Sequence, residues 1–324
     1  MPLREQQLQT YADLLRQGEL VVFPTETVYG LGASAWNAKA VRKIFETKGR
    51  PADNPLIVHI SNVDMVKQFT PSVSARVKLV MQKFWPGPLT LILRKKEEVP
   101  DIVTAGLDTV ALRMPNHPVA LQLIELSGPL VAPSANKSGR PSPTRPEHIF
   151  ADYGKKLPVI DGGPCNIGIE STVLDLTQNP PLILRPGNIT AADIHSACGF
   201  LPRIITAKEA TEAHKPKSPG MKYAHYAPKA RVAWFDPDQS LPDSPKALVL
   251  CHSSAPQLPD GFKGLFRNGD FTTFAQELYN NFRQADAEGF PLILIEKFAP
   301  QQLINDERLI SLHNRISKAT GKAD

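Results

Sequence analysis

The sequence predicts an α/β fold with a larger first domain and a small, open second domain. Short apolar runs alternate with segments of helical period along most of the 324 residues, and a chain of this length can form two cores. Between residues 203 and 229 the periodicity stops, and Pro, Lys, Ala and Gly dominate. We therefore expect a first domain at residues 1–202, a linker at 203–229 and a second domain at 230–324.

The elements of the first domain follow from apolar spacing. Leu8, Tyr11, Leu14 and Leu15 recur at helical spacing, and the pattern ends at Gly18. By the same criteria we expect helices at residues 41–45, 66–69, 73–84, 117–126 and 191–198, the last with Thr190 as its N-cap. Uninterrupted apolar runs predict strands at residues 20–23, 55–60, 89–93, 109–115, 130–132, 159–163, 169–175 and 182–187.

The second domain also alternates strands and helices. We expect strands at residues 230–235, 247–251 and 291–295, and helices at 271–285 and 303–318. No charged constellation is evident there, so a scaffold or partner-binding role is the default expectation.

Composition and motifs exclude several classes of protein. Cys165, Cys198 and Cys251 are far apart, without zinc spacing and in a number that argues against a disulfide framework. Neither a GxGxxG fingerprint nor a P-loop is present, and no apolar run reaches membrane-spanning length. The N-terminus lacks the apolar core of a signal peptide. We therefore expect a cytoplasmic protein, and the net charge of +5 suits an anionic substrate or RNA.

A basic loop at residues 48–60 joins the end of a helix to a strand. Gly49 allows the backbone to bend, and the prolines beside it favour extended neighbours. Lys48 offers a point charge and Arg50 a planar fork, a combination that suits phosphate or carboxylate. A solvated basic turn at a helix C-terminus remains the alternative.

Three further polar loops follow or precede strands, at residues 24–32, 133–144 and 169–175. Hydroxyls, an amide and glycines at strand ends suit a polar ligand, although ordinary connections have similar composition. Arg113 lies inside an apolar strand and Arg185 at the exit of another. On local evidence Arg113 is either paired structurally or faces a ligand anion.

The linker contains Met, two Tyr and a His within residues 217–228. A plain linker does not need these side chains, so we expect the segment to dock onto a surface, in the manner of functional loops. An interdomain strap without ligand contact is the alternative.

Five of these segments resemble, in order, the motifs of the YrdC-like family of L-threonylcarbamoyladenylate synthases. They are residues 24–32, 48–56, 111–115, 133–139 and 170–173. The likeness covers about the first two hundred residues, and residues 218–226 resemble the long form of the enzyme, which adds a Rossmann-like C-terminal domain. The resemblance implies an open twisted α/β sheet in the first domain.

The resemblance also implies a reaction and its partners. L-threonine, bicarbonate and ATP would give threonylcarbamoyl-AMP, pyrophosphate and water. A separate threonylcarbamoyl-transferase complex would pass the product to tRNA, which leaves direct contact with tRNA open. Mg²⁺ is expected with the triphosphate, although the sequence holds no all-protein metal cage. No membrane partner is implied.

Site residues follow from the same motifs. The signature polar tetrad, to which we assign the catalytic role, is Lys48, Arg50, Ser134 and Asn136. ATP would be held by Lys48, Arg50, Asn54, Thr109 and Arg185, with Ser134, Asn136 and Thr144 lining the nucleotide cleft and Tyr223 closing over it. Threonine would be held by Thr27, His59, Arg113 and Ser171, with Arg113 pairing its carboxylate.

Other roles for these residues and other functions for the protein are also compatible with the sequence. The His59 ring could simply pack at a strand end, and Ser171 has no legible His–Asp arrangement that would make it a nucleophile. A non-catalytic RNA-binding module for ribosome or tRNA maturation is the competing function, although RRM, KH and OB signatures are absent. The second competing function is that of a carbamoyl-transfer enzyme in hydrogenase maturation. This chain lacks the additional acylphosphatase-like and zinc-finger segments of those proteins.

Overall fold

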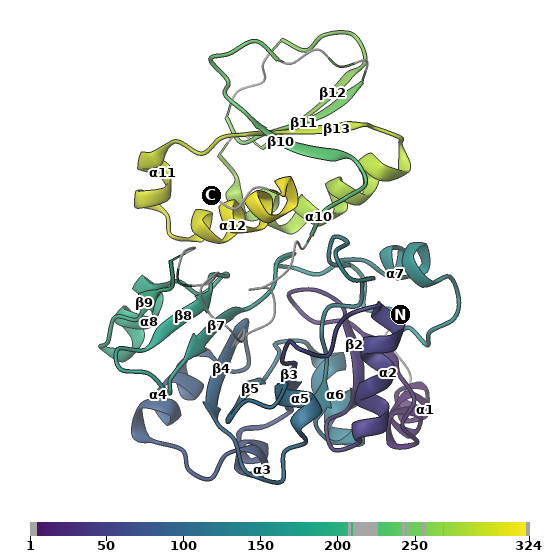
Figure 1. Cartoon of the computed structure of the whole chain (residues 1–324), viewed down its shortest axis with the longest axis vertical. Coiled ribbons are helices and arrows are strands. Elements are labelled where there is room, and N and C mark those ends of the chain that lie inside the picture. The colour runs from purple at the N-terminus through teal and green to yellow at the C-terminus, as the bar shows by residue number, and fades with distance from the viewer. Residues whose placement is uncertain are drawn as a thin grey trace.

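The computed structural model contains two sheets, each with helices packed against it (Figure 1). It describes residues 5–206, 209, 226–241, 244, 246–253, 257–267 and 269–321. The larger sheet has nine strands in the order β1-β2-β6-β3-β5-β4-β7-β8-β9, and the smaller has four in the order β10-β13-β11-β12. The predicted α/β class with a second, smaller α/β domain is confirmed.

The nine-stranded sheet is mixed. Its strands are β1 (Val21–Phe23), β2 (Gly30–Ser34), β3 (Ile57–His59), β4 (Leu89–Arg94), β5 (Thr109–Arg113), β6 (Leu130–Val131), β7 (Thr172–Asp175), β8 (Leu182–Arg185) and β9 (Arg203–Ile204). Only the pairs β3–β5, β4–β7 and β8–β9 are parallel. Parallel β3 and β5 end at His59 and Arg113, which are paired in register, so both side chains reach the same edge of the sheet.

Helices cover this sheet and close its core. They are α1 (Glu5–Arg16), α2 (Ala38–Lys48), α3 (Val66–Phe69), α4 (Ala75–Phe84), α5 (Asp101–Thr104), α6 (Pro118–Ser127), α7 (Pro146–Tyr153) and α8 (Ala191–Cys198), with a 3-10 turn at Val63–Met65. Leu31, Ile44, Val58 and Leu91 are fully buried between the sheet and these helices. Their burial follows from the apolar spacing in the sequence and supplies the main driving force for folding.

Two helix ends explain local features near the site. Asn37 caps α2 by accepting hydrogen bonds from the backbone N–H groups of Lys39 and Ala40. The helix ends at Gly49, whose φ of +62° is the left-handed conformation that glycine adopts readily. The basic loop therefore begins where the sequence predicts. Thr190 caps α8, as expected, through a capping box with Asp193.

The second domain is built on a wholly parallel sheet. Its strands are β10 (Arg231–Phe235), β11 (Ala247–Cys251), β12 (Phe262–Phe266) and β13 (Leu292–Glu296). Its helices are α10 (Phe271–Ala287), α11 (Pro300–Asn305) and α12 (Arg308–Thr320). Figure 1 shows α10 and α12 between this sheet and the first domain. Among the described residues, no helix is both long enough and apolar enough to span a bilayer.

Several elements differ from the sequence predictions. The expected strand at residues 159–163 is a single bridge between Val159 and Val22. Strands β2 and β12 were not expected, because glycine and polar residues obscure their alternation. The expected helix at 303–318 is divided, since α11 ends at the extended residue Asp306. Strand β9 pairs with β8, so the first sheet continues past the predicted boundary at residue 202.

Candidate functional site

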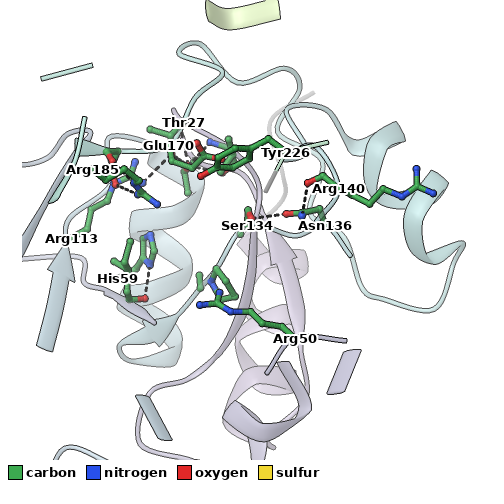
Figure 2. A pocket seen from close by; sticks show the side chains of 17 residues that line it. Thr27, Arg50, His59, Arg113, Ser134, Asn136, Arg140, Glu170, Arg185 and Tyr226 are labelled. Atoms are coloured by element: carbon green, nitrogen blue, oxygen red, sulfur yellow. Dashed lines mark hydrogen bonds between the residues drawn. The ribbon is translucent and has the colours of Figure 1, made fainter. Parts of the chain in front are cut away.

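A cavity opens where the loops at the edge of the first sheet meet (Figure 2). It encloses about 700 Å³ of empty space, mouth included. Its walls come from the 24–32 loop, the basic loop, strands β3, β5 and β8, the 133–144 loop and the 169–175 segment, with Tyr226 as a contribution from the end of the linker. Segments far apart in the sequence therefore share one polar hollow.

The cavity brings together most of the predicted site residues. The eight that line it are Thr27, Arg50, His59, Arg113, Ser134, Asn136, Ser171 and Arg185. Lys48, Asn54, Thr109 and Thr144 are buried but are not among the lining residues. Tyr223 lies outside the described residues.

Lys48 is not a lining residue, and its side chain reaches the backbone of the 133–144 loop. Its Nζ donates to the backbone carbonyls of Ser134 and Asn136, at 2.5 Å each. Burial, followed by the neighbouring charge of Arg50, holds the pKa of Lys48 well below its usual value. In this arrangement Lys48 fixes the loop that carries two cavity residues.

The other three residues off the cavity wall are also buried. Thr109 begins β5 and Arg113 ends it, so Thr109 lies at the opposite end of that strand. The backbone N–H of Thr144 donates to Nδ1 of His148 at 3.1 Å. Asn54 is fully buried, and within the described part of the chain its side-chain amide makes no hydrogen bond.

Arg113 is paired structurally and also lies on the cavity wall. Its guanidinium forms a buried ion pair with Glu26, 2.7 Å from Oε1, and donates to Thr27 Oγ1 at 2.9 Å. The same side chain lines the cavity and is only 4% exposed. It is thus fixed in orientation by a structural partner while facing the hollow.

His59 is neutral in this site. Its burial, followed by the charge of Arg113, lowers the pKa of His59 to about 3. Nδ1 lies 3.2 Å from the carbonyl oxygen of Ile57. Because a carbonyl oxygen only accepts, we assign the ring proton to Nδ1, which leaves Nε2 as an acceptor.

Arg185 and Ser171 are joined on a third wall. Arg185 donates from Nε to the backbone oxygen of Ser171 at 3.0 Å and from a terminal nitrogen to Ser171 Oγ at 3.1 Å. Ser171 Oγ also lies 2.8 Å from Thr90 Oγ1. These hydrogen bonds fix the position of the Ser171 hydroxyl in the cavity wall. Among the described residues, no His–Asp pair contacts this hydroxyl.

Ser134 and Asn136 form a linked pair on the 133–144 loop (Figure 2). Ser134 Oγ donates to Asn136 Oδ1 at 2.5 Å, and Asn136 Nδ2 donates to the backbone oxygens of Lys137 and Arg140 at 2.8 and 2.9 Å. Arg50, opposite them, donates to the backbone oxygen of Asn54 at 3.2 Å. The loop therefore presents preset polar groups to the hollow.

Sequence reasoning missed four polar residues on the cavity wall, namely Thr25, Arg140, Glu170 and Tyr226. Each lies within a segment that the sequence had already marked as polar or aromatic. Glu170 directly precedes Ser171, and Tyr226 lies three residues after Tyr223. Their side-chain directions depend on tertiary packing, which spacing along the chain does not reveal.

Two family models match consecutive parts of the chain. A family model described as telomere recombination matches residues 13–187, and one described as threonylcarbamoyl-AMP synthase, C-terminal domain, matches residues 189–321.

Similar proteins extend over nearly the whole chain. Threonylcarbamoyl-AMP synthases of Pyrococcus abyssi and Bacillus subtilis are each 42% identical to it, over 98% and 97% of this chain and 95% and 93% of their own. The crystal structure of P. abyssi Sua5 complexed with L-threonine is 40% identical, with a TM-score of 0.88 over 99% of this chain and 96% of that one. The chain therefore belongs to the YrdC-like threonylcarbamoyl-AMP synthase family, in the long form that carries a C-terminal domain.

Proposed function

We infer that this protein is an enzyme that forms threonylcarbamoyl-AMP and pyrophosphate from L-threonine, bicarbonate and ATP, for threonylcarbamoyladenosine modification of tRNA. The observation that carries this conclusion is a cavity in which Arg50, Arg113 and Arg185 meet, within a chain of this family.

The chemistry explains why such a site suffices. Threonine and bicarbonate give a carbamate with loss of water, and a carbamate oxygen then attacks the α-phosphorus while pyrophosphate leaves. Both reactants are anionic, so the reaction needs charge neutralisation and alignment more than a protein nucleophile. Fixed guanidinium groups and hydroxyls provide both.

We propose that threonine binds against Thr27, His59, Arg113 and Ser171. Arg113 would pair the carboxylate of the amino acid, because its ion pair with Glu26 already fixes the guanidinium on the wall. Neutral His59 would leave its Nε2 as an acceptor for a donor group of the substrate. Threonine in the crystal structure of the P. abyssi relative supports a threonine site in this fold.

We propose that ATP occupies the remainder of the cavity, against Arg50, Ser134, Asn136 and Arg185. The first three lie on the two loops that Lys48 joins, and Arg185 lies across the hollow from them. Lys48 would act on ATP indirectly, by holding Ser134 and Asn136 in place. We propose that Asn54, Thr109 and Thr144 also contribute to ATP binding: among the described residues, the buried side-chain amide of Asn54 and the hydroxyl of Thr144 make no hydrogen bond and are available to a ligand.

Mg²⁺ would accompany the triphosphate and neutralise part of its charge. The described residues contain no group of three or more His, Cys, Asp or Glu side chains arranged for a metal. Phosphate oxygens and water, the usual ligands of nucleotide-bound magnesium, would complete the coordination.

The remaining proposals concern the cell. A threonylcarbamoyl-transferase complex would receive the product in the cytoplasm, where tRNA is modified. The net charge of +5 makes direct contact between this enzyme and tRNA electrostatically favourable.

The experiment is pyrophosphate release with ATP, Mg²⁺, labelled bicarbonate and L-threonine. Labelled threonylcarbamoyl-AMP should appear in step with pyrophosphate and should depend on every substrate. Arg50→Ala should abolish the reaction, while Arg42→Ala, an exposed arginine on the preceding helix α2, should not. RNA binding without threonine-dependent turnover would overturn the proposal in favour of a binding module.

A further inference from the structure

Glu170 lies on the wall of the cavity (Figure 2). It is held by side chains from both domains. Arg315 of α12 donates from Nε to Glu170 Oε2 at 3.0 Å. Tyr279 of α10 donates to the same oxygen at 3.1 Å, and Ser142 of the first domain donates to Oε1 at 2.6 Å. The second domain therefore reaches the back of a site that otherwise belongs almost entirely to the first.

This contact is a buried ion pair. Glu170 is 6% exposed and Arg315 is not exposed at all. Burial by itself raises the pKa of Glu170, but Arg315 and then Arg185 bring that pKa below its usual value, so the carboxylate is ionised. Two opposite charges are thus compensated at a largely buried position behind the cavity surface.

Arg315 does not touch the cavity. Glu170 lines it, as do the next residue, Ser171, and the arginine bonded to that residue, Arg185. Arg315 and Tyr279 stand behind this wall. Any effect of Arg315 on a bound substrate is therefore indirect, through the cavity residues that it contacts, Glu170 and Tyr226.

A second contact ties the same helices to the cavity. The Tyr226 ring lines the cavity and stacks on Tyr279, with ring centroids 5.4 Å apart, while the Arg315 guanidinium lies 5.8 Å from its centroid. Tyr226 has a φ of +70°, which is unfavourable for a residue with a side chain and persists only where packing imposes it.

We propose that Arg315 is a positioning residue for the reaction: it neutralises Glu170, so that a wall carrying a carboxylate can accept the anionic ATP. The inference rests on the proposed function. An uncompensated carboxylate beside Arg185 would repel phosphate and would compete for that arginine. In this protein the second domain thereby supplies charge compensation to the first.

The test uses the full-length protein and four variants. Arg315→Met removes the cation, Glu170→Gln removes the anion, and the double variant removes both. Arg283→Met is the matched control, because Arg283 of α10 also pairs across the domains, 2.9 Å from Asp152, and does not line the cavity. Binding of ATP is measured by titration calorimetry, which reports affinity independently of turnover.

The proposal predicts that the variants change the affinity for ATP in different directions. Arg315→Met should weaken ATP binding at least about tenfold, because the charge of Glu170 is then no longer neutralised and repels the phosphates. A tenfold change corresponds to about 1.4 kcal/mol of binding free energy. Glu170→Gln should bind ATP as well as the wild type or better, and the double variant should recover most of the affinity lost in Arg315→Met. Arg283→Met should lower thermal stability while leaving the affinity for ATP unchanged.

Wild-type affinity in Arg315→Met, or no recovery in the double variant, would overturn the proposal. If Arg315→Met does not fold, Arg315→Gln, which also removes the cation, is compared with Arg283→Gln: weaker ATP binding in the first alone supports the proposal, and equal binding overturns it. A wild-type enzyme that makes no threonylcarbamoyl-AMP would instead refute the proposed function. These failures are therefore distinguishable.

Discussion

The charged side chains in the cavity wall, and Lys48 behind it, are already held by protein partners. Arg113 pairs with Glu26, Arg185 bonds to Ser171, and Lys48 joins two loop carbonyls. Such bonds remove the side-chain freedom that each group would otherwise lose when a substrate binds. The site is therefore preorganised for anions at the scale of single residues.

Removing Arg113 should impair the use of threonine without preventing the binding of ATP. In Arg113→Ala, the threonine KM should rise at least about tenfold, or turnover should vanish, while ATP still binds. Threonine-dependent pyrophosphate release and ATP titration measure the two effects. Arg94→Ala on the neighbouring strand removes only an exposed ion pair with Asp108 and serves as the control. Unchanged threonine kinetics in Arg113→Ala would remove Arg113 from the site.

Two buried histidines should make the protein sensitive to acid. Burial, with Arg113 and Arg283 as second causes, lowers the pKa of His59 to about 3 and that of His148 to about 4. In the unfolded chain both histidines have a pKa near 6.5, so below that pH they bind protons that the folded protein excludes. Stability is fully present above pH 6.5 and is lost as the pH falls towards those lower values.

Urea unfolding at pH 7 and pH 4.5 tests this effect. Each histidine should lower the free energy of unfolding by about 2 kcal/mol at pH 4.5. His148→Asn should therefore show a smaller acid loss than the wild type, and the exposed His195→Asn should show the wild-type loss. An identical loss in all three proteins would contradict the assignment.

Single residues also show how far sequence reasoning reaches. Arg113 stands out because arginine is rare inside an apolar strand, and the cavity contains it. Its partner Glu26 could not be identified, since the two are distant in sequence and meet only through tertiary packing. Lys48 carries the expected charge, yet its direction depends on carbonyls of a loop far along the chain.

At the scale of elements, loops at strand ends build the site and α10 supports them from the other domain. The segment before Glu170 runs so close to α10 that a Cβ on Gly168 would lie 2.4 Å from the backbone of Gln276. Gly168 also has a φ of +81°. Only glycine combines this conformation with so close an approach.

Gly168→Ala should therefore destabilise the protein more than Gly163→Ala. Gly163 has a φ of +74°, but no atom lies within 4 Å of the place that a Cβ would take there, so alanine should lower the free energy of unfolding by only about 1 kcal/mol. Gly168→Ala adds a backbone clash that should raise the loss to about 3 kcal/mol. Denaturant unfolding measures both, and equal losses would contradict close packing against α10.

Element boundaries were predictable where local chemistry determines them. Thr190 caps α8 and Gly49 ends α2, and both signals lie in the sequence itself. Strand β2 was missed because its glycines resemble a loop, although pairing with β1 and β6 makes it a strand. The bridge at Val159 shows the reverse case, in which an apolar run finds only one residue to pair with.

At the scale of the whole molecule, the second domain is part of the site's structure. Besides Glu170 with Arg315, the domains share the buried pair Asp152 with Arg283 and a contact of Glu307 with the start of α8. Sequence reasoning anticipated a second α/β domain but assigned it no charged constellation. Its arginines become informative only once their first-domain partners are known.

Truncation tests this dependence. A chain ending after Thr206 keeps β9 in the first sheet but leaves Glu170 without Arg315 and Tyr279. We expect at least about a tenfold fall in threonine-dependent pyrophosphate release for a truncated protein that does not aggregate and is folded by circular dichroism. Full activity of the first domain alone would make the tail accessory.

The central claim is that separated loops converge on one cavity where ATP and threonine meet. A crystal structure with both ligands, or with a non-hydrolysable ATP analogue and threonine, tests it most directly. We predict the triphosphate against Arg50 and Arg185 and the threonine carboxylate against Arg113, in the same hollow. Ligands bound at separate surfaces, or a cavity that admits neither, would contradict the account.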